Sequence, residues 1–194
     1  MPARRTLLRA AAAGAGAALL PPARAAAGGD ASGDASRDQY RAMPWSALLP
    51  KGWDPKAPFR GLKLDELDDG DPRAQEALFK AREYWKGAPV EPSLQGARVR
   101  LRGYVVPMSG DAGIVREFLL VPYFGACIHV PPPPANQVVH VLMDKPLKNR
   151  LRTMSSVWVS GTLRIERFSS VMGDAGYAMR GSLVAPYLER PGDK

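Results

Sequence analysis

From residue 98 onward, apolar and polar positions alternate in short runs, which is the pattern of half-exposed β-strands. In "RVRLRGYVV", apolar Val99 and Leu101 alternate with Arg98, Arg100 and Arg102. The runs "REFLLV", "NQVVHVLM", "SVWVSGTLRIERF" and "GYAMRGSLVAPYL" follow, with turn residues between them. The pattern predicts a mainly β protein built on a small OB-like five-stranded barrel, with a β-sandwich as the alternative.

Two details refine this prediction. Gly103 and Gly161 lie inside the first and fourth of these runs, where glycine is typical of a bulge or of a sharp bend at barrel closure. The alternating arginines of the first run favour a solvated strand face over an anion or nucleic-acid site.

One N-terminal helix is expected before the strands. Asp71 can cap it, Pro72 suits its first position, and Gly87 can end it. Between them, apolar residues recur at helical spacing on one face: Ala74, Leu78, Ala81 and Trp85. The segment before the helix is expected to be an irregular extension packed on the barrel.

The N-terminal segment 1–27 has the layout of an export signal peptide: a basic start, an apolar centre and small residues at the end. Arg4-Arg5 resembles a twin-arginine signal, and an ordinary secretory signal or a disordered basic tail are the alternatives. The segment 28–42 is expected to be a flexible leader, and 43–190 a single β-rich domain. We therefore expect a periplasmic or secreted protein, without a membrane span after signal removal.

The net charge of the chain bears on the kind of partner to expect. Removing the segment 1–27 takes away four arginines and no acidic residue, so the formal net charge falls from +8 to +4. The sequence therefore does not predict a nucleic-acid partner. Phosphate loops, Gly-x-Ser-x-Gly and paired metalloprotease histidines are also missing from the sequence, which favours a non-enzymatic role without deciding it.

The stretch "FGACIHVPPPPANQVV" carries the candidate chemistry. Cys127 is the chain's one cysteine, so an intramolecular disulfide is excluded. In an extended chain, Cys127 and His129 would point to the same side, with Cα atoms ~6.5 Å apart. The four prolines after them favour a polyproline II rod that fixes the direction of this pair.

Three interpretations of the pair stay open. It can bind a transition metal, Zn or Cu, through Cys127 and His129, with His140 as a third ligand. It can form a thiol-dependent redox enzyme. It can also be structural, a buried thiol with a histidine that braces the proline loop. The scattered methionines are expected to be core residues rather than a copper site: Met108, Met143, Met154, Met172 and Met179.

The same stretch can serve as a protein-binding module. The proline rod would dock an envelope protein together with the neighbouring aromatic residues Tyr123 and Phe124. Asn136 and Gln137 would hydrogen-bond the donor-poor backbone or a ligand. The rod consists of Pro131, Pro132, Pro133 and Pro134.

These residues also resemble a known group. "LRGYVVPM", "EFLLVPYFGACIHVPPPPANQVV" and "WVSGTL" resemble an uncharacterised family of exported bacterial proteins, classed as a domain of unknown function. The resemblance covers roughly Trp45–Tyr187, and its signature is Cys-x-His-x-Pro-Pro-Pro-Pro-x-Asn-Gln. It implies a periplasmic β-rich domain, an accessory role beside an envelope ABC transporter or a metal-handling system, and no assigned catalytic activity. The first hypothesis is therefore a periplasmic accessory protein that binds Zn or Cu.

Overall fold

The computed structural model describes residues 39–63, 67–68, 70–109, 114–127, 132–147 and 151–187. All of them lie in residues 32–194, and the description concerns this part alone. The predicted signal peptide and most of the predicted leader lie outside the described residues. The last two leader residues form β1 (Arg41–Ala42), which pairs in parallel with β2, so regular structure begins just before Met43.

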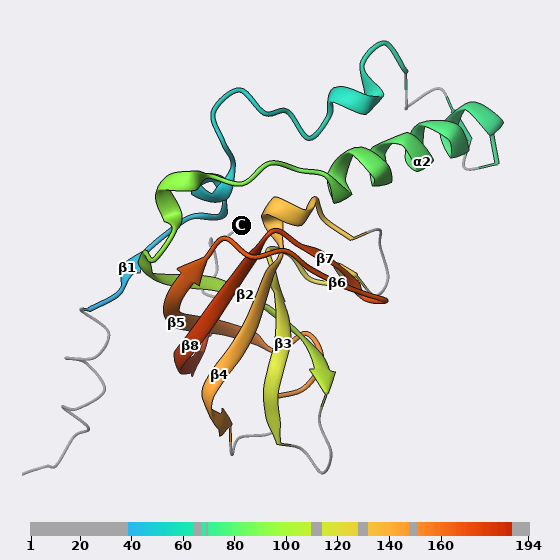
Figure 1. The fold of residues 1–194 in the computed structure, drawn as a ribbon. Helices are drawn as coiled ribbons and strands as arrows, with labels where there is room; N and C mark the ends of the chain where they lie inside the picture. The colour runs from blue at the N-terminus through green and yellow to red at the C-terminus, as the bar shows by residue number, and fades with distance from the viewer. Residues whose placement is uncertain are drawn as a thin grey trace, which may run out of the picture. The chain divides into compact units, whose positions relative to one another are not determined.

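Five strands close into a barrel in the order β2, β3, β4, β8, β5 and back to β2 (Figure 1). β4 and β8 are parallel, and all other neighbours are antiparallel. This is the strand order of an OB-type barrel, so the predicted fold is confirmed and a sandwich is not formed. The strands are β2 (Arg98–Ser109), β3 (Val115–Val121), β4 (Val139–Leu147), β5 (Ser156–Arg164) and β8 (Tyr177–Pro186).

Between β5 and β8 the chain forms a hairpin that the alternation pattern did not predict. Its strands are β6 (Phe168–Ser170) and β7 (Gly173–Ala175), which make a separate two-stranded sheet. The predicted fourth strand ends at Arg164 rather than continuing to Phe168. The hairpin occupies the connection between the last two barrel strands, one of the loops that carry ligands in OB-folds.

The two strand glycines lie where close backbone approach requires them. β2 closes the barrel because it pairs with β5 along Arg98–Tyr104 and with β3 along Tyr104–Ser109. Gly103 lies at this change of partner, where a Cβ would come 2.6 Å from the carbonyl oxygen of Val121. Gly161 lies at the register shift between β5 and β8. Of the two roles predicted for these glycines, Gly161 therefore has the bulge and Gly103 the bend at which the barrel closes.

The predicted helix is α2 (Pro72–Lys86). The Asp71 carboxylate accepts a hydrogen bond from the backbone N–H of Arg73 at 2.8 Å, and Gly87 is the C-cap, as expected. The helix packs against the segment before it, because the Trp85 indole N–H donates to the carbonyl oxygen of Pro55 at 2.8 Å. Its C-terminal end is held by Arg167, whose guanidinium donates to two backbone carbonyls, those of Lys86 and Ala88.

The arginine side chains of β2 stack on aromatic side chains, so this strand face is not simply covered by solvent. The guanidinium of Arg98 lies 4.9 Å from the ring centroid of Tyr40, that of Arg100 lies 4.4 Å from Trp158, and that of Arg102 lies 4.5 Å from Tyr187. Each contact is a cation–π interaction. The aromatic residues of this face thus serve as partners for the protein's own arginines.

The apolar residues form two clusters on opposite faces of β2 and β3. Val105 belongs to the main core and its neighbour Val106 to a smaller second cluster, since successive strand residues point to opposite faces. The second cluster is covered by the β3–β4 connection and by the hairpin. Its buried members are Val106, Leu119, Val121, Ala126, Val138 and Ala175.

Tyr177 joins the N-terminal extension to the barrel. Its side chain is fully buried, and its hydroxyl donates to the carbonyl oxygen of Leu48 at 2.8 Å while accepting from the N–H of Glu91 at 2.6 Å. Leu48 belongs to η1 (Trp45–Leu48), and Glu91 caps η4 (Pro92–Leu94). A third short helix, η2 (Ala57–Phe59), lies between them in sequence.

We expect Tyr177→Phe to lower the free energy of unfolding by about 2 kcal/mol, because it leaves a buried carbonyl and an N–H without their partner. Urea denaturation measures the change. The matched control is Tyr84→Phe, since the Tyr84 hydroxyl also donates to a backbone carbonyl but lies at the surface. Equal effects of the two substitutions would contradict the role assigned to Tyr177.

Candidate functional site

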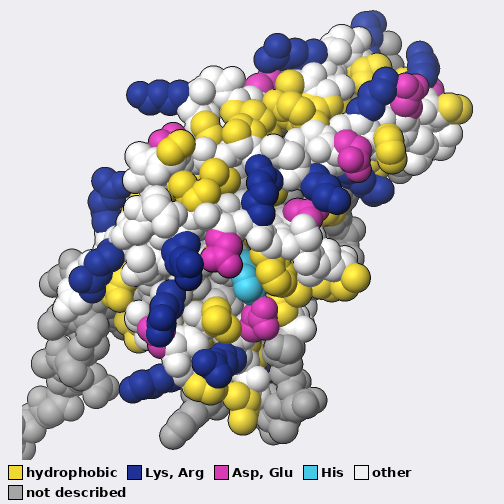
Figure 2. Space-filling model, in the orientation of Figure 1, with side chains coloured by type: hydrophobic (Ala, Val, Ile, Leu, Met, Phe, Trp, Pro, Cys, Tyr) yellow, Lys and Arg dark blue, Asp and Glu magenta, His cyan; other side chains and the backbone are white. Residues whose placement is uncertain are grey.

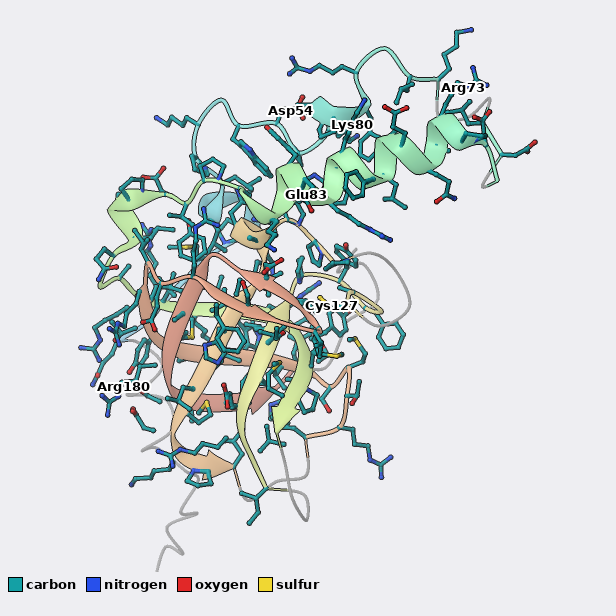
Figure 3. All side chains as sticks on the ribbon, turned by 45° about the vertical axis from the view of Figure 1, so that its right-hand side comes forward. Asp54, Arg73, Lys80, Glu83, Cys127 and Arg180 are labelled. Carbon is teal, nitrogen blue, oxygen red and sulfur yellow. The ribbon has the colours of Figure 1, made fainter. Side chains whose placement is uncertain are left out.

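A cleft of about 390 Å³ lies beside Cys127, with walls from three parts of the chain. One wall is the last turns of α2, the second is the proline segment after Cys127, and the third is the β6–β7 hairpin. Figure 3 shows Glu83 on the helix and Cys127 on the barrel side beneath it. The apolar lining includes Trp85, Pro132, Pro133, Val171 and Met172, and the charged lining Arg82, Glu83, Lys86 and Asp174.

Cys127 is half-buried at this cleft and is not in a disulfide. Its backbone has a positive φ, in the left-handed region, so the extended backbone predicted at this residue is wrong. Burial raises the pKa of the thiol to about 11, which keeps it protonated at neutral pH. His129 lies outside the described residues, so its predicted position beside the thiol stays a prediction.

The proline segment is rigid and well anchored where the structure describes it. The backbone of Pro134 is close to polyproline II, and a 3-10 turn, η5 (Ala135–Gln137), follows. The amide of Asn136 donates to the carbonyl oxygen of Pro89 at 2.8 Å, and that of Gln137 donates to Trp45 at 3.0 Å. Both predicted binding amides therefore tie the segment to neighbouring backbone, and Asn136 is fully buried.

His140, the histidine within the described residues, lies on β4. The imidazole Nε2 of His140, on β4, lies 2.8 Å from a carboxylate oxygen of Glu117. The ring stacks on Phe168 of the hairpin, with centroids 3.8 Å apart and planes 10° from parallel. His140 thus holds the base of the hairpin that lines the first cleft.

His140 also lines a second cleft, of about 270 Å³. This second cleft and the Cys127 cleft have no lining residue in common. Arg116, Arg164 and Arg180 surround it together with Asp144. Figure 2 shows basic and acidic side chains close together on this face, and Figure 3 places Cys127 and Arg180 on different sides of the barrel. The structure therefore does not bring His140 and Cys127 to one cleft.

Comparisons with known proteins identify the group to which this barrel belongs. A family model described as "protein of unknown function (DUF3299)" matches residues 45–186. The chain belongs to the DUF3299 family. The crystal structure of a DUF3299 family protein from Pseudomonas aeruginosa PAO1 is similar: 39% identity, a TM-score of 0.62, and coverage of 78% of this chain and 99% of that one. A search of curated proteins found no match.

In this DUF3299 domain the predicted aromatic anchors lie close to Cys127 in sequence but outside the lining of the first cleft. Tyr123 is 44% exposed and Phe124 is 66% exposed, on the loop before Cys127. Phe124 makes an edge contact with Tyr104 at 5.8 Å between centroids. Both rings are therefore available at the surface. The proline Pro131 lies outside the described residues.

Sequence reasoning missed two of the three walls of the DUF3299 cleft. Trp85 was assigned to the apolar stripe of the helix, although it also lines the cleft. The hairpin residues were not assigned to an element. The one local signal in this stretch is the glycine of "SSVMGD", Ser169–Asp174, which indicates a break in regular structure. The turn itself is formed by Val171 and Met172, which carry no turn signal.

Two features of the described residues bear on the chemistry of the site. Among the described residues, no three His, Cys, Asp or Glu side chains converge in a way that could hold a metal ion. No charged residue is a cause of the shift in the Cys127 pKa, so no described cation activates the thiol. In the same part of the chain, no helix has the length and apolarity needed to cross a membrane.

Proposed function

We propose that this DUF3299 protein is a non-enzymatic binding module of the bacterial envelope, which holds an extended segment of another envelope protein in the Cys127 cleft. The observation that carries the proposal is the cleft itself, with Trp85 on one wall and Pro132 and Pro133 on another. Flat aromatic and proline surfaces are typical of peptide-binding grooves. The envelope location is supported by the predicted export signal.

The lining favours a peptide segment. A volume of about 390 Å³ suits a few side chains rather than a whole domain. The prolines of this wall have no N–H donors, so their backbone can offer an occupant only carbonyl oxygens, which accept hydrogen bonds from N–H or O–H groups. The lining carries two basic residues, Arg82 and Lys86, and two acidic residues, Glu83 and Asp174. Because these charges balance, the occupant needs no strong net charge.

Exposure of the hairpin tip supports the same proposal. The side chain of Val171 is fully exposed and lies at the rim of the cleft. Tyr123 and Phe124 extend the apolar surface on the loop before Cys127. An exposed apolar rim around a cleft is typical of a protein-interaction site. A transporter component, as the family resemblance implies, is one such envelope protein.

The alternatives have less support from geometry. A thiol enzyme needs a thiolate near neutral pH, whereas burial raises the pKa of Cys127 to about 11. A zinc site through Cys127 and His140 would need both in one cleft, and they line different ones. The copper alternative has support of its own and is treated below.

The test is site-specific photo-cross-linking in envelope extract, with the cross-linking residue at Val171 and, as control, at Leu142. Leu142 is also an exposed apolar residue, but it lines the second cleft. We expect one protein to cross-link from Val171 and not from Leu142. Equal cross-linking from both positions would overturn the proposal.

The purified partner then allows a quantitative test. Trp85→Ala is expected to weaken its binding at least about tenfold, as for a central aromatic residue of an interface. Phe79→Ala is the control, because Phe79 is exposed on the same helix outside the cleft. Val171→Asp provides a variant whose fold is not at risk. The proposal fails if Trp85→Ala and Val171→Asp both bind like the control.

A further inference from the structure

The sulfur-containing side chains of the described residues separate into two groups. Met43, Met143 and Met179 belong to the main core and are at most 5% exposed. The others are half-buried and pack against the second cluster, on the outer face of β2 and β3: Met108, Cys127, Met154 and Met172. The expectation that the methionines are core residues therefore holds fully for Met143 and Met179. The other three methionines of that expectation are half-buried.

The second group comes from four separate places in the chain. Met108 lies near the end of β2, Cys127 in the β3–β4 connection, Met154 in the β4–β5 connection, and Met172 between β6 and β7. Figure 3 shows further sulfur atoms on the side of the barrel where Cys127 is labelled. The fold therefore brings all four residues to the second cluster, and the first cleft gives access to two of them, Cys127 and Met172.

Two contacts bring the loops that carry Met154 and Met172 close to the Cys127 loop. The backbone N–H of Gly125 donates to the sulfur of Met154 at 3.3 Å, so this sulfur reaches the loop two residues before the cysteine. Gly173, which follows Met172, lies so close to the thiol that a Cβ there would come 3.4 Å from Cys127 Sγ. Met154 therefore reaches the loop that carries Cys127, and Met172, next to Gly173, lines the same cleft as the thiol.

The backbone is held in unusual conformations at two of these residues. In the described part of the chain, Cys127 and Met154 are the non-glycine residues with positive φ, at +66° and +63°. Such conformations cost on the order of 1–3 kcal/mol and persist where the surroundings fix them, often at ligand sites.

We propose that Cys127, Met154 and Met172 bind a soft monovalent metal ion, Cu(I). Thiolate and thioether ligands select Cu(I), whereas zinc prefers sites with several thiolate, imidazole or carboxylate ligands. Binding forms a Cu–S bond to Cys127 and releases the thiol proton to solvent, with no change in oxidation state. This proposal does not rest on peptide binding, although both ligands would use the same cleft.

The test is anaerobic Cu(I) titration of the full chain in competition with bathocuproine disulfonate. One equivalent is expected to bind with release of one proton. Cys127→Ser is expected to weaken binding at least about tenfold, and Met154→Leu with Met172→Leu in one chain by a similar factor. Met179→Leu is the matched control in the main core, and it should bind like the unaltered chain.

X-ray absorption of the Cu(I) complex supplies the second measurement. Scattering from three sulfur neighbours is expected, falling to one after the double methionine substitution. The methionine variants keep the test valid if Cys127→Ser does not fold, since Leu replaces Met at nearly constant volume. Absence of binding, or unchanged affinity in the double methionine variant, would overturn the proposal, and neither result bears on peptide capture.

Discussion

Replacement of Gly161 by alanine is expected to lower the free energy of unfolding by roughly 3 kcal/mol. Gly161 is buried at the bulge between β5 and β8, and a Cβ there would collide with the carbonyl oxygen of Arg180 and lie 2.7 Å from Cγ of Met179. The carbonyl belongs to the neighbouring strand of a closed barrel, so it cannot move without loss of strand pairing. Chemical denaturation of the full chain measures the effect.

The matched control for this substitution is Gly87→Ala at the C-cap of α2. A Cβ at Gly87 would meet nothing closer than 3.8 Å, and its negative φ is available to any residue. We expect the control to change stability by less than about 0.5 kcal/mol. A Gly161→Ala chain as stable as the control would mean that the barrel can relax around the bulge. That result would contradict the close backbone approach assigned to Gly161.

The sequence predicted the elements whose signals are local. The helix was found with its limits because Asp71, Pro72 and Gly87 act on backbone groups within one turn. The barrel strands were found because alternation follows directly from the pleat. Their closure could also be anticipated, since Gly103 and Gly161 interrupt otherwise good strands. The hairpin was missed because its strands are three residues each, too short for a period to appear.

The candidate site was predicted in its central segment and missed in its surroundings. The Cys127–Pro134 stretch is unusual in composition, so it could be selected without a structure. Its partners could not, because Trp85 and the hairpin reach it only through tertiary packing of α2 and the barrel. The same holds for His140, whose partners Glu117 and Phe168 come from other strands. The extended geometry failed at Cys127, since the turn before the prolines places it at positive φ.

Alkylation of Cys127 is expected to be about 100-fold slower at pH 8 than that of an ordinary cysteine. Burial raises the pKa of the thiol from 9.0 to about 11, and a raised pKa means less thiolate, the reactive form, at any lower pH. Two pH units correspond to about a hundredfold change in thiolate. The rate with iodoacetamide should therefore still rise about tenfold per pH unit near pH 10.

The control for alkylation is a chain with Cys127→Ser and Phe79→Cys, which moves the thiol to an exposed position on α2. Its rate should level off above about pH 8.5, as for a free thiol. Circular dichroism at each pH shows whether the barrel is intact. If Cys127 itself levels off near pH 7, the thiol is activated by a group outside the described residues, and the thiol-enzyme alternative becomes the better one. A slow, steadily rising rate leaves Cys127 to roles that need a protonated or metal-bound sulfur, which is what both binding proposals require of it.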